Sequence, residues 1–303
     1  METQIKEIKE YFDMMALDKS PHTIKSYERS TKRFLSFLCI HTFGDIENIS
    51  ASDCRNFQAK LSAIEIAPGK LMSKASVNTN VRPVKAMFNW FVEQEYLENS
   101  PFDRVKALKQ TRKVPVYLTR EETISMIRGS ENLLDKFLVC LFVTTGLRRQ
   151  EMANLKLTDI NDCHILVKGK GSKERVLRLQ DDICVLMKEY LVVRNKRPRY
   201  RDSEYLFVSR RGTKFAGSGL LFKIKQIAIN SGIPEDRAKK ITVHSLRHTF
   251  TANMVESGAD IRLIQGALGH SSINTTERYA HIRSSALDKA MQNQGSVFGD
   301  INE

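Results

Sequence analysis

The first hundred residues carry apolar side chains at the spacing of amphipathic helices. Residues three or four positions apart lie on the same face of a helix, and Ile5, Ile8, Phe12 and Met15 form the first such face. Further runs follow the helix-start signal Ser20-Pro21 and continue to about residue 92. This pattern predicts an all-helical N-terminal domain over residues 1–102. Pro83 either kinks the last helix or begins a new one.

The pattern changes at residues 103–117, which are basic, poorly periodic and predicted to be a linker. A capping box at Thr119 and Glu122 then predicts a helix start, and residues 133–146 predict a buried helix that ends at a glycine. Strand signals at residues 164–168 and 174–179 predict a hairpin, and residues 205–208 predict a short third strand.

Further on, Ser257-Gly258 is predicted to end a helix that starts near His244, Asp260 to cap the start of the next helix, and Gly269 to end that one. The fold class is therefore mainly α with a small antiparallel β-sheet. It combines an all-α N-terminal domain with a mixed α/β domain over residues 118–303.

Charge narrows the possible partners. The chain has 48 Lys and Arg against 35 Asp and Glu, a net charge of +13, which favours a polyanion such as nucleic acid. The excess lies in residues 101–120 and 188–225. We therefore expect Arg197, Arg199 and Arg201 to contact DNA. A membrane-spanning segment is excluded, because the longest apolar stretch, residues 137–143, is far shorter than the roughly 20 residues required.

The cysteines indicate the cellular compartment. They are odd in number, widely separated and contain no CxxC pair, which predicts reduced thiols, a cytoplasmic protein and no metal site. The five are Cys39, Cys54, Cys140, Cys163 and Cys184. The N-terminus contains acidic residues and is not typical of a signal or transit peptide.

A pair of arginines follows the buried helix. Arg148 and Arg149 come directly after Thr145-Gly146-Leu147, and Glu151 follows. An arginine at the end of an apolar helix must meet an acid or an anion, because an unpaired buried charge is costly. Glu151 is the structural partner, and an oxyanion is the functional alternative.

The turn of the predicted hairpin carries Lys168, Lys170 and Lys173. A lysine on a two-stranded ribbon can reach into a groove or donate a proton to a leaving oxygen. Charged hairpin tips are more often simply solvated, so this signal alone is weak.

Histidines and an arginine gather in residues 244–281. His244 and Arg247 are three apart and share a helix face, so both could meet one oxyanion. The four-residue spacing of His244 and His248 would also suit zinc, but no HExxH glutamate or third ligand accompanies it. Tyr279 alone would be an ordinary half-buried tyrosine.

Together these segments resemble the tyrosine recombinase family, also called the phage integrase family. The matching motifs are TGLR with Glu151, the GKG turn at residues 169–171, HxLRHxF at residues 244–250, and LGHxxxxTTxxY at residues 268–279. SPHTIKSY at residues 20–27 and NSPF at residues 99–102 are similar to the SAM-like core-binding domain of Xer-type members.

The resemblance implies a site-specific DNA recombinase that cleaves and rejoins strands through a 3′-phosphotyrosyl intermediate, without metal or cofactor. The catalytic residues would be Arg148, Lys170, His244, Arg247, His270 and Tyr279. Glu151 would support the arginines, and Lys168 and Lys173 remain competitors of Lys170. Arg149, Lys168 and Lys173 would contact DNA, alongside the basic run at residues 197–201.

The resemblance also implies partners. These are double-stranded DNA and a tetramer, of identical or related recombinases, on paired sites. Residues 285–293 would form a C-terminal helix that docks either on a neighbour or on its own domain. A type IB topoisomerase and a non-catalytic DNA-binding regulator are the alternative functions.

Overall fold

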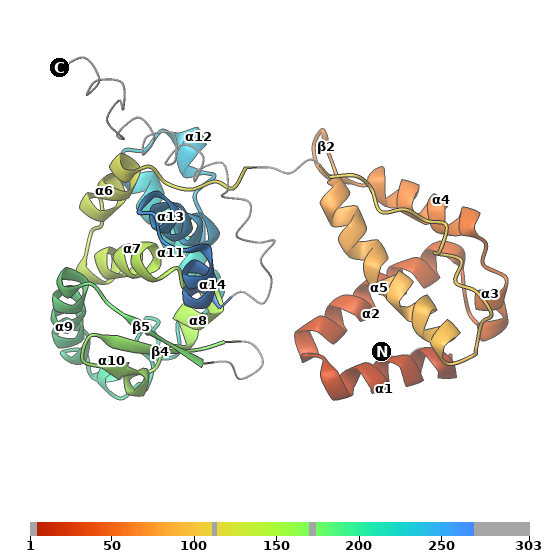
Figure 1. Ribbon diagram of the computed structural model, residues 1–303, viewed down its shortest axis with the longest axis horizontal. Coiled ribbons are helices and arrows are strands. Elements are labelled where there is room, and N and C mark those ends of the chain that lie inside the picture. The colour runs from red at the N-terminus through yellow and green to blue at the C-terminus, as the bar shows by residue number, and fades with distance from the viewer. Residues whose placement is uncertain (1–4, 111–113, 170–173, 270–303) are drawn as a thin grey trace, which may run out of the picture. The chain divides into compact units, whose positions relative to one another are not determined.

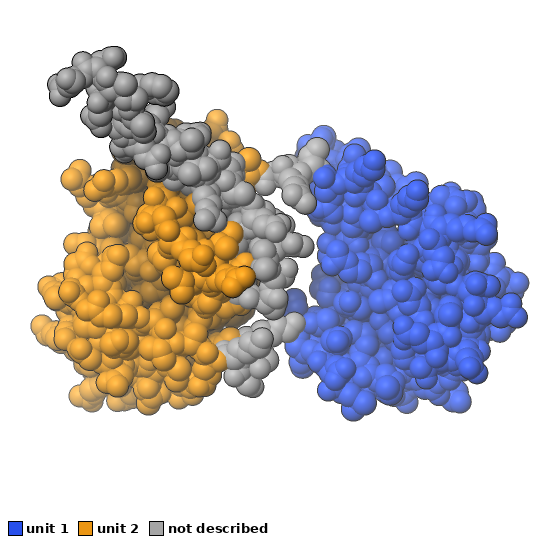
Figure 2. Space-filling model, viewed as in Figure 1, with its two compact units in different colours: residues 1–112 blue, residues 113–303 orange. Residues whose placement is uncertain are grey.

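The computed structural model describes residues 5–110, 114–169 and 174–269 of the chain. The chain divides into two compact units, Met1–Arg112 and Lys113–Glu303 (Figure 2). Within the described residues, no helix is long and apolar enough to cross a membrane.

The first unit contains five helices and one small hairpin among its described residues (Figure 1). Their bounds are α1 Lys6–Asp18, α2 Pro21–Leu38, α3 Phe43–Glu47, α4 Ala51–Ser62, β1 Glu65–Ala67, β2 Lys70–Leu71 and α5 Lys74–Glu93. The prediction of an all-helical domain is thus wrong in one detail. The Pro68-Gly69 turn, with Gly69 at φ +68°, folds its flanking residues back into two paired strands.

Helix α5 passes through Pro83 without interruption, so no new helix begins there. The predicted start of α2 is confirmed, because the Ser20 hydroxyl accepts a hydrogen bond from the backbone N–H of Thr23 at 3.3 Å. Edge-to-face aromatic pairs fill the core of this unit; the centroids of Phe34 and Phe57 are 5.0 Å apart.

The beginning of the expected linker packs on the first unit. Val105 is buried in its core, and Leu108 packs against that core. The Asn78 side chain accepts from the N–H of Leu108 at 3.0 Å and donates to its carbonyl at 2.9 Å. Residues 103–108 are therefore held by the first unit.

The second unit is also mainly helical. Its elements are α6 Arg120–Arg128, α7 Leu133–Thr145, α8 Arg149–Asn154, the 3₁₀ turn η1 Leu157–Asp159, β3 Ile160–Asn161, β4 His164–Lys168, β5 Glu174–Arg178, α9 Asp181–Asn195, α10 Pro198–Arg201, α11 Gly217–Asn230, α12 Glu235–Ala238, α13 Val243–Glu256 and α14 Ile261–Leu268. The apolar helix α7 packs against α6, α9, α11 and α13. The predicted class, mainly α with a small antiparallel sheet, is confirmed.

The sheet has the antiparallel order β3-β4-β5. Its third strand is Ile160–Asn161, and the expectation of a strand at residues 205–208 is wrong. Tyr205 and Val208 form only isolated bridges, to Lys156 and Lys214. The capping box at Thr119 is confirmed, as are the start of α14 at Asp260 and its end at Gly269.

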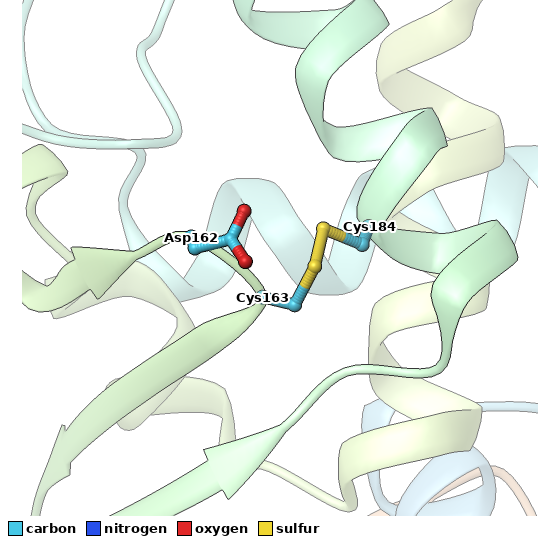
Figure 3. Close-up of side chains that lie close together, drawn as sticks. All are labelled: Asp162, Cys163 and Cys184. Atoms are coloured by element: carbon cyan, nitrogen blue, oxygen red, sulfur yellow. A yellow bond between two sulfur atoms is a disulfide. The ribbon is translucent and has the colours of Figure 1, made fainter.

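The prediction of five reduced thiols is wrong for one pair. Cys163, just before β4, and Cys184 on α9 form a disulfide with Cα atoms 5.3 Å apart (Figure 3). Cys39, Cys54 and Cys140 are free. The pair was hidden in the sequence because only the packing of the hairpin beside α9 brings together cysteines 21 positions apart.

Candidate active site

The end of helix α7 positions the first arginine. Gly146 ends α7 in the left-handed conformation, at φ +60°. A Cβ on Gly146 would overlap the Phe250 ring on α13, so the close approach of α7 and α13 requires glycine. Leu147 is fully buried, and Arg148 follows as the N-cap of α8. The anchored Leu147 directs the chain so that Arg148 emerges beside α14.

Glu151 is the buried acid at the centre of the site. It accepts hydrogen bonds from the backbone N–H and the Nη1 of Arg148, both at 2.8 Å. It also accepts from Nη1 and Nη2 of Arg175, at 3.1 and 2.8 Å. Burial raises the pKa of Glu151, but the hydrogen bonds from Arg175 and Arg148 outweigh it and lower this pKa to about 2. Glu151 is therefore ionised, and the two guanidiniums leave the trio with a net positive charge.

Three arginines meet at the C-terminal end of helix α14. They donate to three consecutive carbonyl oxygens: Arg175 Nε to Ala267 at 2.7 Å, Arg247 Nη2 to Leu268 at 2.8 Å, and Arg148 Nη2 to Gly269 at 2.7 Å. The last carbonyls of a helix lack partners within it and carry partial negative charge. The arginines satisfy these carbonyls.

This convergence unites two distant motifs. Arg247 lies on α13, is buried, and donates through Nη1 to the carbonyl of Gly146 at the end of α7. Arg247 and Arg148 thus donate to adjacent peptide groups although they are far apart in the sequence. The structure brings together the two arginines that the sequence singled out for binding an oxyanion.

His244 is exposed one helical turn before Arg247 on α13. Desolvation, followed by the positive charges of Arg149 and Arg247, lowers the pKa of His244. Its imidazole is therefore neutral at pH 7 and can either donate or accept a proton.

Comparison with known proteins matches this geometry to a family. The model of the phage integrase family matches residues 117–285, and that of the phage integrase N-terminal SAM-like domain matches residues 8–95. The chain belongs to the phage integrase family. It is accordingly a tyrosine recombinase, a site-specific enzyme that cleaves and rejoins DNA strands through a tyrosine intermediate.

Individual recombinases resemble the chain along most of its length. Tyrosine recombinase XerD of Listeria monocytogenes serotype 4b (strain F2365) is 30% identical over 275 residues, covering 87% of this chain and 89% of that protein. The crystal structure of XerA recombinase matches with a TM-score of 0.54 and 28% identity, covering 96% and 99% of the two chains. The lambda integrase tetramer bound to a Holliday junction shares the fold, with a TM-score of 0.70, 17% identity, and 92% and 77% coverage.

Four of the site residues expected in this recombinase, Lys170, Lys173, His270 and Tyr279, lie outside the described residues. The expected C-terminal helix at residues 285–293 also lies outside them. Their roles remain predictions.

The side chains of Lys168 and Arg149, which were expected to contact DNA, each lie beside another residue of the second unit. The Nζ of Lys168 lies 2.9 Å from Oδ1 of the buried Asp159, so this lysine is held at the end of β4. The Arg149 side chain lies along Gly217, where a Cβ would come within 3.2 Å of its Nε. A DNA phosphate would compete with the Asp159 carboxylate for Lys168.

The basic run after α9 contains two kinds of arginine. Arg197, Arg199 and Arg201 are exposed; the Arg197 guanidinium stacks on the Tyr200 ring, 5.3 Å from its centroid. Arg194 is different, because its guanidinium is fully buried and donates to the carbonyls of residues 203, 205 and 206. Arg194 is therefore a structural cation that adds nothing to the basic surface.

Among the described residues, Asp162, Cys163 and Cys184 form the group of possible metal ligands (Figure 3). The two sulfurs are joined in the disulfide, and the Asp162 carboxylate lies 3.1 Å from the Lys188 ammonium. Neither sulfur is available as a thiolate, so this group does not support a metal site.

Sequence reasoning missed Arg175. Val176 and Arg175 lie on opposite faces of β5, and the structure has Val176 62% exposed and the Arg175 side chain 12% exposed. Arg175 pairs across the sheet with the fully buried Val167. Leu177 and the buried Leu179 share the face of Arg175, so the alternation along residues 174–179 was the local signal that could have indicated an inward arginine.

Proposed function

We propose that Arg148 and Arg247 bind the nonbridging oxygens of the scissile phosphodiester. The observation that carries this proposal is the meeting of both guanidiniums at the adjacent carbonyls of Leu268 and Gly269. A phosphodiester repels nucleophiles because its oxygens are negative. Two fixed guanidiniums offset the charge that grows in the transition state.

Tyr279 is the proposed nucleophile. Its hydroxyl, with an ordinary pKa of about 10, must lose a proton to attack, and a cationic pocket favours the phenolate. The Tyr279 oxygen forms a bond to phosphorus as the bond from phosphorus to the 5′ oxygen breaks, which leaves a 3′-phosphotyrosyl enzyme. Attack by a 5′ hydroxyl reverses the step and rejoins a strand. The phosphodiester energy is retained, so the reaction needs no cofactor.

Lys170 is the proposed acid that protonates the leaving 5′ oxygen. Lys168 is the weaker candidate, because its ammonium already pairs with Asp159. His244 and His270 hydrogen-bond the same phosphate, and the lowered pKa of His244 keeps its imidazole neutral, the form that can accept the nucleophile's proton. Glu151 orients Arg148. These residues supply both the charge stabilisation and the proton transfers, without a metal.

Residues 1–102 act in this proposal as the core-binding domain, residues 103–117 as a basic linker, and residues 118–303 as the catalytic domain. Arg149, Lys173 and the exposed arginines of residues 197–201 contact the DNA backbone. Recombination joins two duplexes, so four protomers work together as a homo-tetramer or with a related recombinase. The lambda integrase tetramer on a Holliday junction, which shares the fold, supports this assembly. The protein acts on DNA in the cytoplasm.

A nicked suicide duplex tests this proposal. The duplex carries the protein's own binding site, selected from random oligonucleotides, and the nick prevents religation. We expect wild-type protein to form a covalent complex, and Tyr279→Phe to bind the duplex equally and form none. Arg148→Ala and Arg247→Ala should each slow trapping by about 100-fold or more. Tyr96→Phe, whose hydroxyl donates to Glu10 in the first unit, is the control and should react normally.

Failure of the wild-type protein to form a covalent complex on DNA to which it binds would overturn the proposal. The alternatives give other results. A type IB topoisomerase would relax supercoiled DNA that lacks the site, without exchanged products. A non-catalytic regulator would bind without trapping. The comparisons favour neither alternative, since the matching relatives are recombinases.

A further inference from the structure

Arg175 points into the catalytic unit from the edge strand of its sheet. Strand β5 pairs only with β4 among the described strands, and Arg175 lies opposite the buried Val167. The same register exposes Val176. Turning an arginine inward and a valine outward costs free energy unless the guanidinium is well paired. This arrangement indicates that Arg175 has a role beyond filling the core.

The guanidinium of Arg175 joins three elements of the site. Two nitrogens form a bidentate pair with Glu151 on α8, at 3.1 and 2.8 Å. The Nε donates to the carbonyl of Ala267 on α14 at 2.7 Å. Arg175 itself lies on β5, five positions after Lys170 in the sequence. One planar side chain therefore connects the hairpin, the acid beside Arg148, and the helix that leads to His270.

The buried carboxylate of Glu151 needs a cation that remains paired with it when Arg148 binds a phosphate. This carboxylate is 6% exposed and is shared between Arg148, 38% exposed, and Arg175, 12% exposed. If Arg148 turns toward a phosphate, its bond to Glu151 weakens. A buried carboxylate without a cation is costly and takes up a proton.

We propose that Arg175 is a positioning residue for strand cleavage. It keeps Glu151 ionised and holds the end of α14 while Arg148 engages the phosphate. The protonated carboxyl would accept fewer hydrogen bonds from Arg148, so Arg148 would lose its orientation. This proposal rests on the phosphate-binding role of Arg148 given above.

Arg175→Met tests the proposal, with Arg178→Met as the matched control. Arg178 lies three positions later on the same strand, and its side chain is 64% exposed and pairs with an exposed Asp181. The measurement is the rate of covalent trapping on the nicked duplex at saturating protein, from pH 5 to pH 8.5. Each rate is divided by the wild-type rate at the same pH, so that ionisations common to both proteins cancel.

We expect Arg175→Met to bind the duplex within about twofold of wild type and to trap about 100-fold more slowly at neutral pH. The rate ratio should fall further toward pH 5, because loss of Arg175 raises the pKa of Glu151. Adding Glu151→Gln should remove this pH dependence. Arg175→Lys keeps the cation but not the bidentate geometry, so it should be slower than wild type with a flat ratio. Arg178→Met should match wild type throughout.

A ratio for Arg175→Met that is the same at every pH would overturn the proposal and leave Arg175 a purely structural residue. If Arg175→Met fails to bind DNA, Arg175→Lys decides, and a wild-type rate for Arg175→Lys at every pH would also overturn it. Failure of the proposed function looks different. In that case wild-type protein itself forms no covalent complex, or Arg148→Ala traps normally.

Discussion

The Nη2 of Arg148 donates a hydrogen bond to the carbonyl oxygen of Gly269 at 2.7 Å, across 121 positions of the sequence. Gly269 is the left-handed residue that ends α14, and it directly precedes His270. The backbone at the end of one helix thus positions the arginine at the start of another. Changes in that backbone should therefore alter the orientation of Arg148.

Gly269→Ala should impair both stability and cleavage. An alanine at this position would have to adopt the left-handed backbone conformation of Gly269, at φ +60°. Its Cβ would lie 3.0 Å from Arg175 Nη1 and 3.4 Å from Arg148 Nη1. We expect a loss of about 1–2 kcal/mol in the free energy of unfolding and a reduction of about tenfold or more in covalent trapping. Gly266→Ala is the control, since open space surrounds it within the helix. It should be neutral or stabilising by up to about 1 kcal/mol. Equal effects of the two substitutions would contradict this account.

Arg194→Met should destabilise the fold without weakening DNA binding by the folded protein. The substitution removes the donors for the carbonyls of residues 203, 205 and 206. We expect a loss of about 3 kcal/mol in the free energy of unfolding, measured by urea denaturation. Arg199→Met, at an exposed position, should change stability by less than about 0.5 kcal/mol. A stable Arg194→Met protein with reduced DNA affinity would show that Arg194 contacts DNA instead.

Neutralising the exposed basic run should weaken binding to all DNA sequences alike. We expect the triple substitution of Arg197, Arg199 and Arg201 to glutamine to reduce the slope of log affinity against log salt by about 3, if each arginine contacts one phosphate. The measurement is the affinity for specific and random duplexes, determined by fluorescence anisotropy at salt concentrations from about 50 to about 300 mM. Lys239→Gln, whose lysine pairs with Glu235, is the control. An unchanged slope would mean that the run is only solvated surface.

Desolvation, and after it the positive charges of Arg149 and Arg247, should lower the pKa of His244. Because the folded-state pKa of His244 is lowered, the unfolded chain binds this proton more tightly. The contribution of neutral His244 to the free energy of unfolding is therefore lost as the pH falls below about 6.5, the pKa of a histidine in the unfolded chain. Arg149→Met should raise the pKa of His244 in an NMR titration, with His244→Gln used to assign its signal. Lys214→Met is the charge-matched control. A pKa of His244 that does not respond to Arg149→Met would rule out this electrostatic effect.

The Cys163–Cys184 disulfide should stabilise the second unit. Alkylation of the denatured protein without reductant should modify three of the five cysteines, and all five after reduction. A cross-link that closes a loop of this length contributes about 3 kcal/mol by restricting the unfolded chain. Cys184→Ser should therefore lower the melting temperature, whereas Cys39→Ser, which affects a free exposed thiol, should not. Modification of all five cysteines without reductant would show that the disulfide is absent.

Local sequence patterns, such as helix caps and short motifs, predicted most of the helices and the family. The caps at Ser20, Thr119 and Asp260 and the helix end at Gly269 depend on atoms within about four residues, so they can be read from sequence. The order of the motifs around Arg148 and Arg247 likewise indicated a tyrosine recombinase. What these local signals lacked was any information on which distant groups meet.

Only the tertiary structure decided the pairing of Arg175 with Glu151, the burial of Arg194 and the pairing of Cys163 with Cys184. Alternation with Leu177 and Leu179 is consistent with the inner face for Arg175, but only the fold supplies the buried Glu151 with which its guanidinium forms a bidentate pair. Each of these contacts joins separate elements of the fold. Their existence depends on how a strand face or helix end packs against a partner distant in sequence, which local patterns do not specify.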